Sequence, residues 1–124
     1  MNITKTIKIL DSLAQETRLK AFKVMVKAGL DGITSGEIGK KIGVAQNTTS
    51  FHLSHLENSG LIKSRKEGRY VIYSADFKVV ESLMKYLLES CCFDSKNKCC
   101  VSDNFMNLLA EDGEINITKS LIRK

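Results

Sequence analysis

Residues 34–60 read TSGEIGKKIGVAQNTTSFHLSHLENSG, which predicts two short helices joined by a tight turn. Thr34 followed three positions later by Glu37 is the capping-box pattern that begins a helix. Gly43 and Gly60 can each end a helix, because glycine readily adopts the left-handed backbone that often follows a helical C-terminus. Helix, glycine turn and helix together form the outline of a helix-turn-helix.

The second of these helices, residues 46–59, is predicted to have one buried and one exposed face. Thr49, Leu53 and Leu56 recur at helical spacing and should face the core. In a helix-turn-helix, the N-terminal residues of the second helix lie at base edges in the DNA major groove. Gln and Asn can bond adenine through two hydrogen bonds, and an aromatic ring can touch a thymine methyl group. The predicted DNA-contacting residues of this helix are Gln46, Asn47, Thr48, Ser50 and Phe51.

Two histidines lie on the same helix and are predicted to play different roles. His52 borders the face of Thr49 and Leu53, so packing against the protein is favoured over a base contact, which is the alternative. His55 is expected to lie in solvent.

A basic hairpin is predicted after the second helix. Residues 61–65 and 69–74 predict two strands, with a turn over residues 66–68. A hairpin in this place is typical of the wing of a winged helix. Its cations would meet phosphates or the minor groove, which supplies affinity and salt dependence but little specificity. The predicted wing contacts are Lys63, Arg65, Lys66 and Arg69.

Amphipathic helices are predicted on both sides of this segment. Residues 3–14 and 16–28 each carry an apolar stripe at helical spacing. A longer helix begins at Asp76, and its stripe is wider than a domain of about 75 residues needs for its own core. That width favours a dimer surface, with an intramolecular core helix as the alternative. The first stripe is Ile3, Ile7, Leu10, Leu13 and Ala14. The second is Leu19, Phe22 and Val26, with Val24 and Met25 beside them. The third is Val79, Val80, Leu83, Met84, Leu87, Leu88 and Cys91. A last short helix is expected over residues 101–109, and residues 111–124 show no clear period.

Length and composition fit one domain, or a small domain with an appendage, in 124 residues and 13.8 kDa. Hydrophobic residues make up 43% and charged residues 27%, which excludes a disordered composition. No apolar run approaches about 18 residues and the N-terminus lacks a signal peptide's apolar core, so a cytoplasmic protein is expected. Residues 1–75 hold 12 Lys/Arg and 6 Asp/Glu, and residues 76–124 hold 7 and 8. The basic first part suits DNA, with solubility as the alternative.

All four cysteines lie within ten positions, at Cys91, Cys92, Cys99 and Cys100. Thiolates prefer soft or borderline ions, so an all-sulfur set excludes magnesium and calcium. Three thiolates suit trivalent arsenic or antimony. Four suit tetrahedral zinc or cadmium, and lead is a further soft ion. A disulfide or polysulfide between the pairs would make a redox site, and incidental cysteines are the remaining alternative.

Four segments resemble the ArsR/SmtB family of metal-responsive repressors. They are residues 13–19 (LAQETRL), 44–53 (VAQNTTSFHL), 56–62 (LENSGLI) and 65–73 (RKEGRYVIY). The resemblance covers about residues 5–92. It implies a winged-helix homodimer, paired through its N- and C-terminal helices, that represses its own operon and leaves DNA when an inducer binds.

The chain departs from the family pattern at two positions. Glu16 stands where the family often has proline, and Ala45 stands where it often has a serine that caps the recognition helix. Because alanine caps poorly, the second departure puts one phosphate or cap contact in question, but not the fold.

The resemblance also bears on the sensing site. One family site uses a Cys-Val-Cys motif on the first helix of the helix-turn-helix, but residues 34–40 hold no cysteine. Another uses Asp and His pairs on the long helix, but no histidine follows His55. The cysteines present resemble those of arsenic-responsive relatives with three ligands at the end of the long helix. Cys91, Cys92 and Cys99 match that pattern, and Cys100 has no certain counterpart.

Together these features predict a mainly α chain with a β-hairpin wing, a winged helix-turn-helix. Residues 1–92 would form the DNA-binding and dimerisation domain, and residues 93–124 a cysteine-containing extension. The predicted function is repression from a palindromic operator, relieved when As(III) or Sb(III) binds the cysteines. Sensing of cadmium, lead, zinc or persulfide on the same fold is the alternative, and a tail that binds a protein partner is another. An enzyme is not expected, because a thiol oxidoreductase would need Cys-X-X-Cys on a βαβ scaffold.

Overall fold

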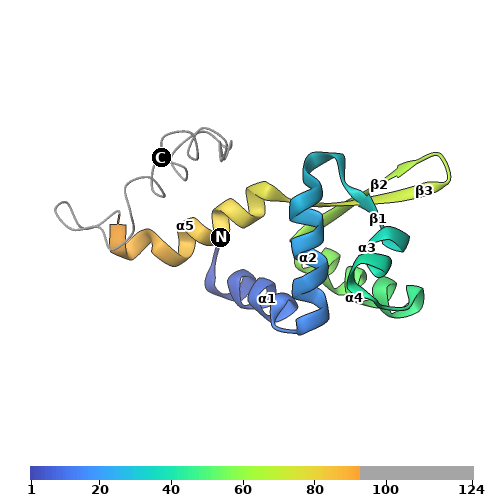
Figure 1. The fold of residues 1–124 in the computed structure, drawn as a ribbon. Helices are drawn as coiled ribbons and strands as arrows, with labels where there is room; N and C mark the ends of the chain where they lie inside the picture. The colour runs from blue at the N-terminus through green and yellow to red at the C-terminus, as the bar shows by residue number, and fades with distance from the viewer. Residues whose placement is uncertain (93–124) are drawn as a thin grey trace, which may run out of the picture. The chain divides into compact units, whose positions relative to one another are not determined.

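The computed structural model describes residues 1–92, with side-chain burial described through residue 88. The chain divides into two compact units, of which Asn2–Asp76 is one, and the other contains Met1 and the residues from Phe77 onward. The elements, in chain order, are α1 (Ile3–Leu13), α2 (Glu16–Ala28), the 3-10 helix η1 (Gly29–Asp31), β1 (Ile33–Thr34), α3 (Ser35–Ile42), α4 (Gln46–Ser59), β2 (Ile62–Glu67), β3 (Tyr70–Ala75) and α5 (Phe77–Cys92), as Figure 1 shows.

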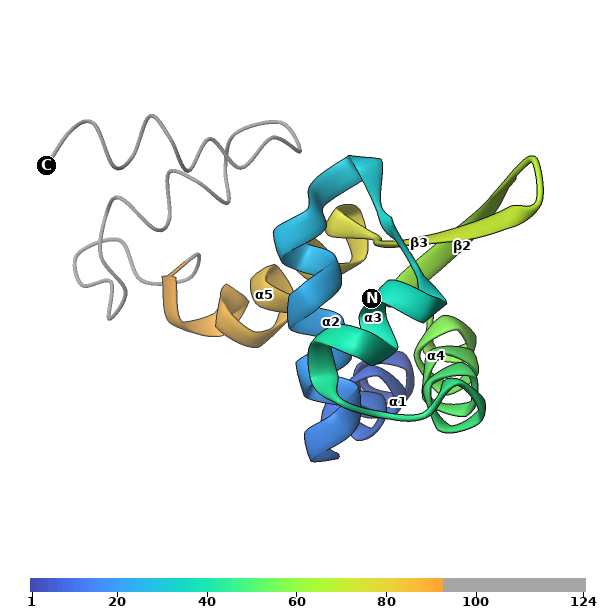
Figure 2. The same ribbon diagram turned by 45° about the vertical axis from the view of Figure 1, so that its right-hand side comes forward.

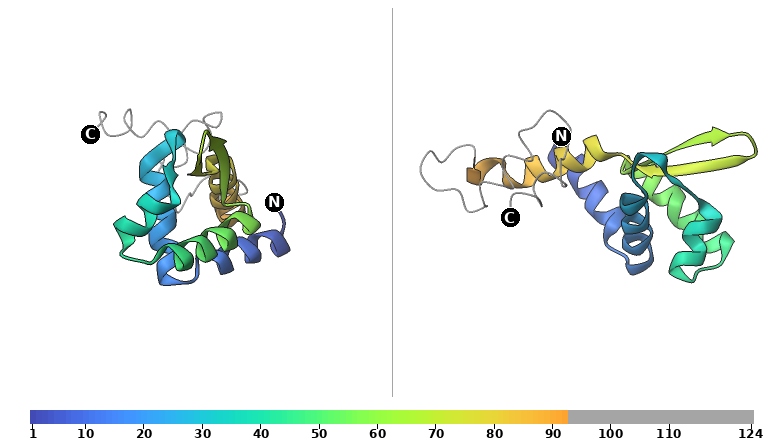
Figure 3. Two further views of the ribbon diagram at one scale, coloured as in Figure 1. Left: turned by 90° about the vertical axis from the view of Figure 1, so that its right-hand side faces the viewer. Right: turned by 45° about the horizontal axis from the view of Figure 1, so that its top comes forward.

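The Asn2–Asp76 unit is a winged helix-turn-helix, as predicted. Its four α-helices gather on one side, and the β2–β3 hairpin extends beyond them (Figure 3). Thr34 Oγ1 accepts a hydrogen bond from the Glu37 N–H at 3.3 Å, which confirms the predicted N-cap of α3. Gly43 and Gly60 follow α3 and α4 in the left-handed conformation, which confirms both predicted helix ends.

The wing belongs to a three-stranded antiparallel sheet with strand order β1-β3-β2. Glu67 pairs with Tyr70, so the turn consists of Gly68 and Arg69, and the predicted turn over residues 66–68 is wrong. Gly68 has a φ of 62°, which suits the first position of the two-residue turns that match hairpin twist. The turn therefore places Arg69 at the tip of the wing. β1 and η1 were not predicted, because elements of two and three residues show no periodicity.

Each α-helix of this unit contributes at least one apolar residue to the core. The face predicted for α4 is confirmed, since Thr49, Leu53 and Leu56 are at most 1% exposed. Burying one such leucine stabilises a fold by about 1.5–3 kcal/mol. The largest apolar side chains that are fully buried are Ile9, Met25, Ile38, Leu53, Leu56 and Leu61.

α1 exposes much of its apolar stripe in the single chain. Ile3, Ile7 and Leu10 are 61%, 59% and 42% exposed. The residues that α1 buries are Thr6, Ile9 and Ser12. Ser12 Oγ donates to Ser59 Oγ at 3.0 Å where α1 packs against α4. The inner face of α1 is thus small and largely polar.

The buried face of α2 is rotated from the predicted stripe. Phe22 is buried as expected, but Leu19 and Val26 are 45% and 41% exposed. Ala21 is buried together with Met25, which was predicted to lie beside the stripe, because α2 packs against α3, α4 and β3.

The second unit contains α5, which begins at Phe77, one residue after the predicted start. Within its stripe Leu83 is buried and Leu87 is 53% exposed. The helix expected over residues 101–109 and the segment 111–124 lie outside the described residues. In the part of the chain that the structure describes, no helix is long and apolar enough to cross a membrane.

Candidate nucleic-acid interface

The junction of α3 and α4 depends on two glycines. Gly43 follows α3 with a φ of 72°, and its N–H donates to the Gly39 carbonyl. Gly39 lies where α3 packs closely against Thr49 of α4. A Cβ there would be 2.9 Å from both Thr49 Oγ1 and the Val44 carbonyl oxygen. The absence of a side chain at Gly39 thus sets how closely the two helices pack.

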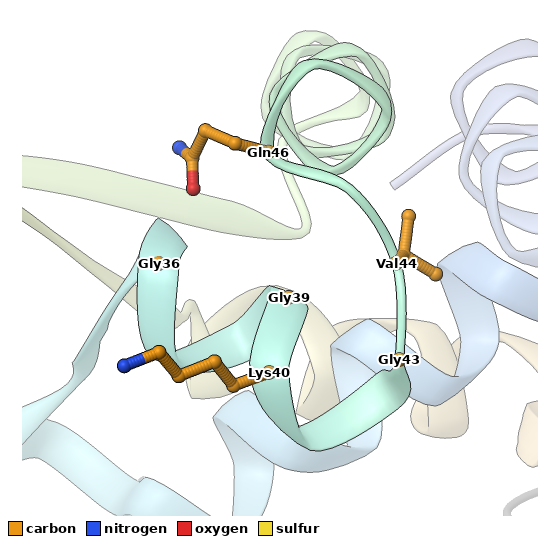
Figure 4. Close-up of a pocket in the computed structure, with 6 residues that line it drawn as sticks. All are labelled: Gly36, Gly39, Lys40, Gly43, Val44 and Gln46. Carbon is orange, nitrogen blue, oxygen red and sulfur yellow. The ribbon is translucent and has the colours of Figure 1, made fainter.

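A shallow hollow of about 430 Å³ lies between α3 and the start of α4 (Figure 4). Half of its lining residues are glycines, which leave the backbone open, and Lys40 supplies a positive charge. At Gly43, which is exposed and has no atom within 4 Å of its missing Cβ, a sugar-phosphate strand can approach the backbone closely. The lining residues are Gly36, Gly39, Lys40, Gly43, Val44 and Gln46.

α4 presents its predicted DNA-contacting residues to solvent. The exposed residues are Gln46, Asn47, Thr48, Ser50 and Phe51. Phe51 is 64% exposed, and its ring centroid lies 5.5 Å from that of His52 and 6.4 Å from that of His55. The face therefore combines hydrogen-bonding groups with one apolar surface, the two kinds of contact that read bases in the major groove.

The start of α4 is held by a side chain other than its cap. Ala45 is the N-cap residue and makes no side-chain cap hydrogen bond, as its sequence predicts. Gln46 Nε2 donates instead to Ser35 Oγ at 2.9 Å, which ties the start of α4 to the start of α3. Amides at a helix N-terminus attract anions, so this end of α4 suits a DNA phosphate.

Arg18 of α2 joins three helices through its guanidinium. Its Nε donates to the Ser12 carbonyl of α1 at 2.6 Å, and its Nη1 lies 3.5 Å from His52 Nδ1 of α4. His52 is half-buried, in agreement with its predicted packing role, and His55 is exposed as expected. Burial lowers the pKa of His52, and the positive charges of Arg18 and His55 lower it further.

The lowered pKa of His52 predicts a loss of stability in mild acid. The unfolded chain takes up a proton near the ordinary value of 6.5, while the folded protein resists it. The free energy of unfolding should therefore fall as the pH drops below that value. Urea midpoints at about pH 7.5 and about pH 5.5 measure this difference. His52→Gln should reduce it and His55→Gln should retain most of it; an unchanged difference in His52→Gln contradicts the assignment.

The wing carries exposed cations on a hairpin fixed to α4. Ser64 Oγ donates to Glu57 Oε2 of α4 at 2.7 Å. Lys63, Lys66 and Arg69 are exposed. Among the side chains of residues 1–88, none forms a hydrogen bond or ion pair with the side chains of these three. Their charges are therefore available to an external anion.

Arg65 differs from these cations, because its guanidinium binds its own chain. Nε lies 2.9 Å from Glu67 Oε1, Nη1 donates to the Leu30 carbonyl at 3.3 Å, and Nη2 donates to the Asp31 carbonyl at 2.7 Å. Sequence reasoning grouped Arg65 with the DNA contacts and missed these bonds. The sequence did offer one sign of an internal partner. Glu67 lies two residues after Arg65, so both side chains are on the same face of the strand.

The cysteine site lies largely beyond the described part of the chain. Cys91 and Cys92 are the last two residues of α5. Cys99 and Cys100 lie outside the described residues, so the proposed ligand set stays a prediction. Within residues 1–88, whose side chains the structure describes, no group of three His, Cys, Asp or Glu side chains is arranged to hold a metal ion.

Residues 13–65 match the family described as "Helix-turn-helix domain". The chain is 27% identical over 86 residues to the transcriptional activator HlyU of Vibrio cholerae, covering 69% of this chain and 77% of that protein. It is 34% identical over 79 residues to a cadmium resistance transcriptional regulatory protein, a CadC homolog of Staphylococcus aureus, covering 63% of each. These relatives are transcriptional regulators.

Solved structures share the fold. Reduced HlyU from Vibrio cholerae N16961 matches with a TM-score of 0.55 and 28% identity, over 72% of this chain and 90% of that one. The homodimeric winged helix-turn-helix domain Mb0332 from Mycobacterium bovis, described as a possible ArsR-family regulator, matches with a TM-score of 0.57 over 77% and 89%. At 19% identity, this second match supports the fold alone.

Proposed function

We propose that this chain is a winged helix-turn-helix transcriptional regulator of the ArsR family and acts as a homodimeric repressor relieved by As(III) or Sb(III). The inducer-free dimer would bind a palindromic operator. Binding of the ion by the C-terminal cysteines would release the DNA.

One observation carries the DNA-binding part of the proposal. The exposed residues of α4 and the free cations of the wing belong to one unit, in which α4 packs against β2 (Figure 2). Asn47 and Phe51 would meet base edges, while Lys66 and Arg69 would meet phosphates. This division of roles supports recognition of duplex DNA.

The exposed stripe of α1 supports the dimer. Ile3, Ile7 and Leu10 form an apolar surface that the single chain leaves in solvent. A second copy would bury it, and Mb0332, which shares the fold, is described as homodimeric. A two-fold dimer reads two half-sites about 34–36 Å apart, or a multiple of that distance.

The chemistry of thiolates supports the inducer. Soft ions prefer sulfur ligands, and trivalent arsenic takes three thiolates in a pyramid. Cys91 and Cys92 at the end of α5, with Cys99 seven residues further on, would supply them. The ion can release DNA only if it binds the DNA-free state more tightly. A difference of about 2 kcal/mol would weaken DNA binding roughly 30-fold.

The test is fluorescence anisotropy with a duplex that contains the promoter of the chain's own gene. We expect tight binding without inducer and roughly 30-fold weaker binding with arsenite or antimonite. Cys91→Ser, Cys92→Ser and Cys99→Ser should each bind DNA like the wild type and no longer respond to arsenite. If all three variants still release DNA, the site is wrong.

Cadmium is the second candidate inducer. The relative from Staphylococcus aureus is named for cadmium resistance, and four thiolates suit tetrahedral cadmium or zinc. Cys100→Ser separates the two ions, because a three-thiolate arsenic site tolerates the change and a four-thiolate site does not. Titration with cadmium, zinc and polysulfide in parallel would reveal metal or redox sensing in place of arsenic sensing.

A further inference from the structure

The side chain of Arg65 crosses the sheet of the winged unit from β2 towards β1. Arg65 on β2 lies opposite Ile72 on β3, and Ile72 lies opposite Thr34 on β1. Directly opposed residues share one face of a sheet, so the Arg65 side chain starts on the face of Ile72. It ends on the carbonyls of Leu30 and Asp31, in the 3-10 helix that precedes β1. Arg65 thus links the outer strand of the wing to the far edge of the sheet.

The charged guanidinium of Arg65 is engaged in bonds within the protein. All three of its nitrogens are engaged: Nε with Glu67, Nη1 with Leu30 and Nη2 with Asp31. Carbonyls in the last turn of a helix lack partners within the helix and favour a cation nearby. The planar fork of arginine offers several donors in fixed directions to such a set, whereas the lysine ammonium is a compact charge with three rotatable donors.

We propose that Arg65 is a positioning residue that holds the wing against η1, so that Lys66 and Arg69 reach DNA phosphates. Arg65 itself makes no phosphate contact. We call the bonds from Arg65 to the Leu30 and Asp31 carbonyls the brace. The effect on DNA affinity rests on the proposed DNA-binding function, but the brace itself is a property of the free protein.

The neighbours of Arg65 explain why its loss would be felt at the wing. β2 pairs with β3 alone, since the sheet order is β1-β3-β2. Beyond that pairing and the buried side chain of Ile62, the described side-chain hydrogen bonds of β2 to the helices and η1 run from Ser64 to Glu57 and from Arg65 to η1. Without Arg65, the hairpin keeps the backbone hydrogen bonds between β2 and β3 and loses its side-chain hydrogen bonds to η1.

The brace is tested first without DNA, by amide hydrogen exchange on the full-length chain. Arg65→Gln should speed exchange in η1 and β1 about fivefold or more, because local opening there becomes easier. Arg65→Lys should behave like Arg65→Gln, since an ammonium cannot replace the fork. Lys66→Gln, a loss of charge at the next residue, should leave these rates unchanged. Unchanged exchange in Arg65→Gln would overturn the brace.

The effect on DNA is tested by a mutant cycle against the wing cations. Arg65→Gln should weaken binding of a promoter duplex about fivefold to tenfold in the wild-type background and less than about twofold in Lys66→Gln/Arg69→Gln. A residue that contacts phosphate directly would instead give the same loss in both backgrounds. Its loss would also reduce, by about 0.9 in each background, the steepness with which the logarithm of the binding constant falls with the logarithm of salt concentration. Arg65→Lys would then restore the affinity for DNA. That result would overturn the positioning role.

The two readouts separate this inference from the proposed function. If the wild type binds no duplex in the anisotropy titration, the DNA-binding proposal fails. The exchange experiment still decides whether Arg65 braces the hairpin. If the wild type binds DNA and exchange is unchanged, the brace fails alone.

Discussion

Gly39→Ala is expected to destabilise the protein by about 2 kcal/mol and to weaken DNA binding with it. The added methyl would meet the Val44 carbonyl oxygen and the Thr49 hydroxyl at 2.9 Å. One of these atoms is backbone and the other is buried, so α3 and α4 must move apart. This cost exceeds the gain of about 1 kcal/mol that alanine brings to a helix interior. Urea unfolding followed by circular dichroism measures the change.

Gly36→Ala is the matched control, since it makes the same substitution in the same helix. The nearest atom to its Cβ would be Gln46 Oε1 at 3.8 Å, an ordinary contact. Stability should therefore stay constant or rise by up to about 1 kcal/mol. If both variants behave alike, close packing at Gly39 is not what fixes the helix-turn-helix.

Ile7→Glu is expected to weaken self-association at least about 100-fold, because the dimer would bury one carboxylate from each copy in an apolar contact. Ile7 is 59% exposed in the single chain, so the fold of each copy should survive. Sedimentation equilibrium gives the dissociation constant, and circular dichroism confirms that α1 still forms.

Lys8→Glu provides the control on the same helix. Lys8 is exposed and lies off the stripe, so its charge reversal should leave the dimer intact. A dimer of wild-type strength in Ile7→Glu would exclude the α1 stripe as the contact surface. A wild type that is monomeric at all concentrations would exclude the dimer itself.

The helix-turn-helix could be predicted because its signals are local. Thr34 caps α3, and Gly43 and Gly60 end the two helices, each through backbone preferences that act within a few residues. The inner face of α4 followed from the spacing of Leu53 and Leu56 for the same reason. These features depend little on what lies across the fold.

The orientation of the flanking helices could not be predicted in the same way. Periodicity shows that α1 has an apolar stripe, but it cannot show whether its own chain or another covers that stripe. That α1 buries the small polar residue Ser12 follows from its contact with Ser59 of α4, which the sequence does not reveal. The wing posed a related problem at Arg65, whose partners include two backbone carbonyls. Every residue carries a carbonyl, so sequence cannot identify which ones a cation binds.

The strand order gives the wing cations a second consequence, for solubility. β2 lies at an edge of the sheet, and an edge strand is a template on which another chain can add by backbone pairing. β2 carries Lys63, Arg65 and Lys66 along that edge, and charged side chains, lysine above all, discourage such addition. Charge removal from the wing should therefore promote aggregation as well as weaken DNA binding. The same residues would keep the free protein from polymerising while no DNA covers the hairpin.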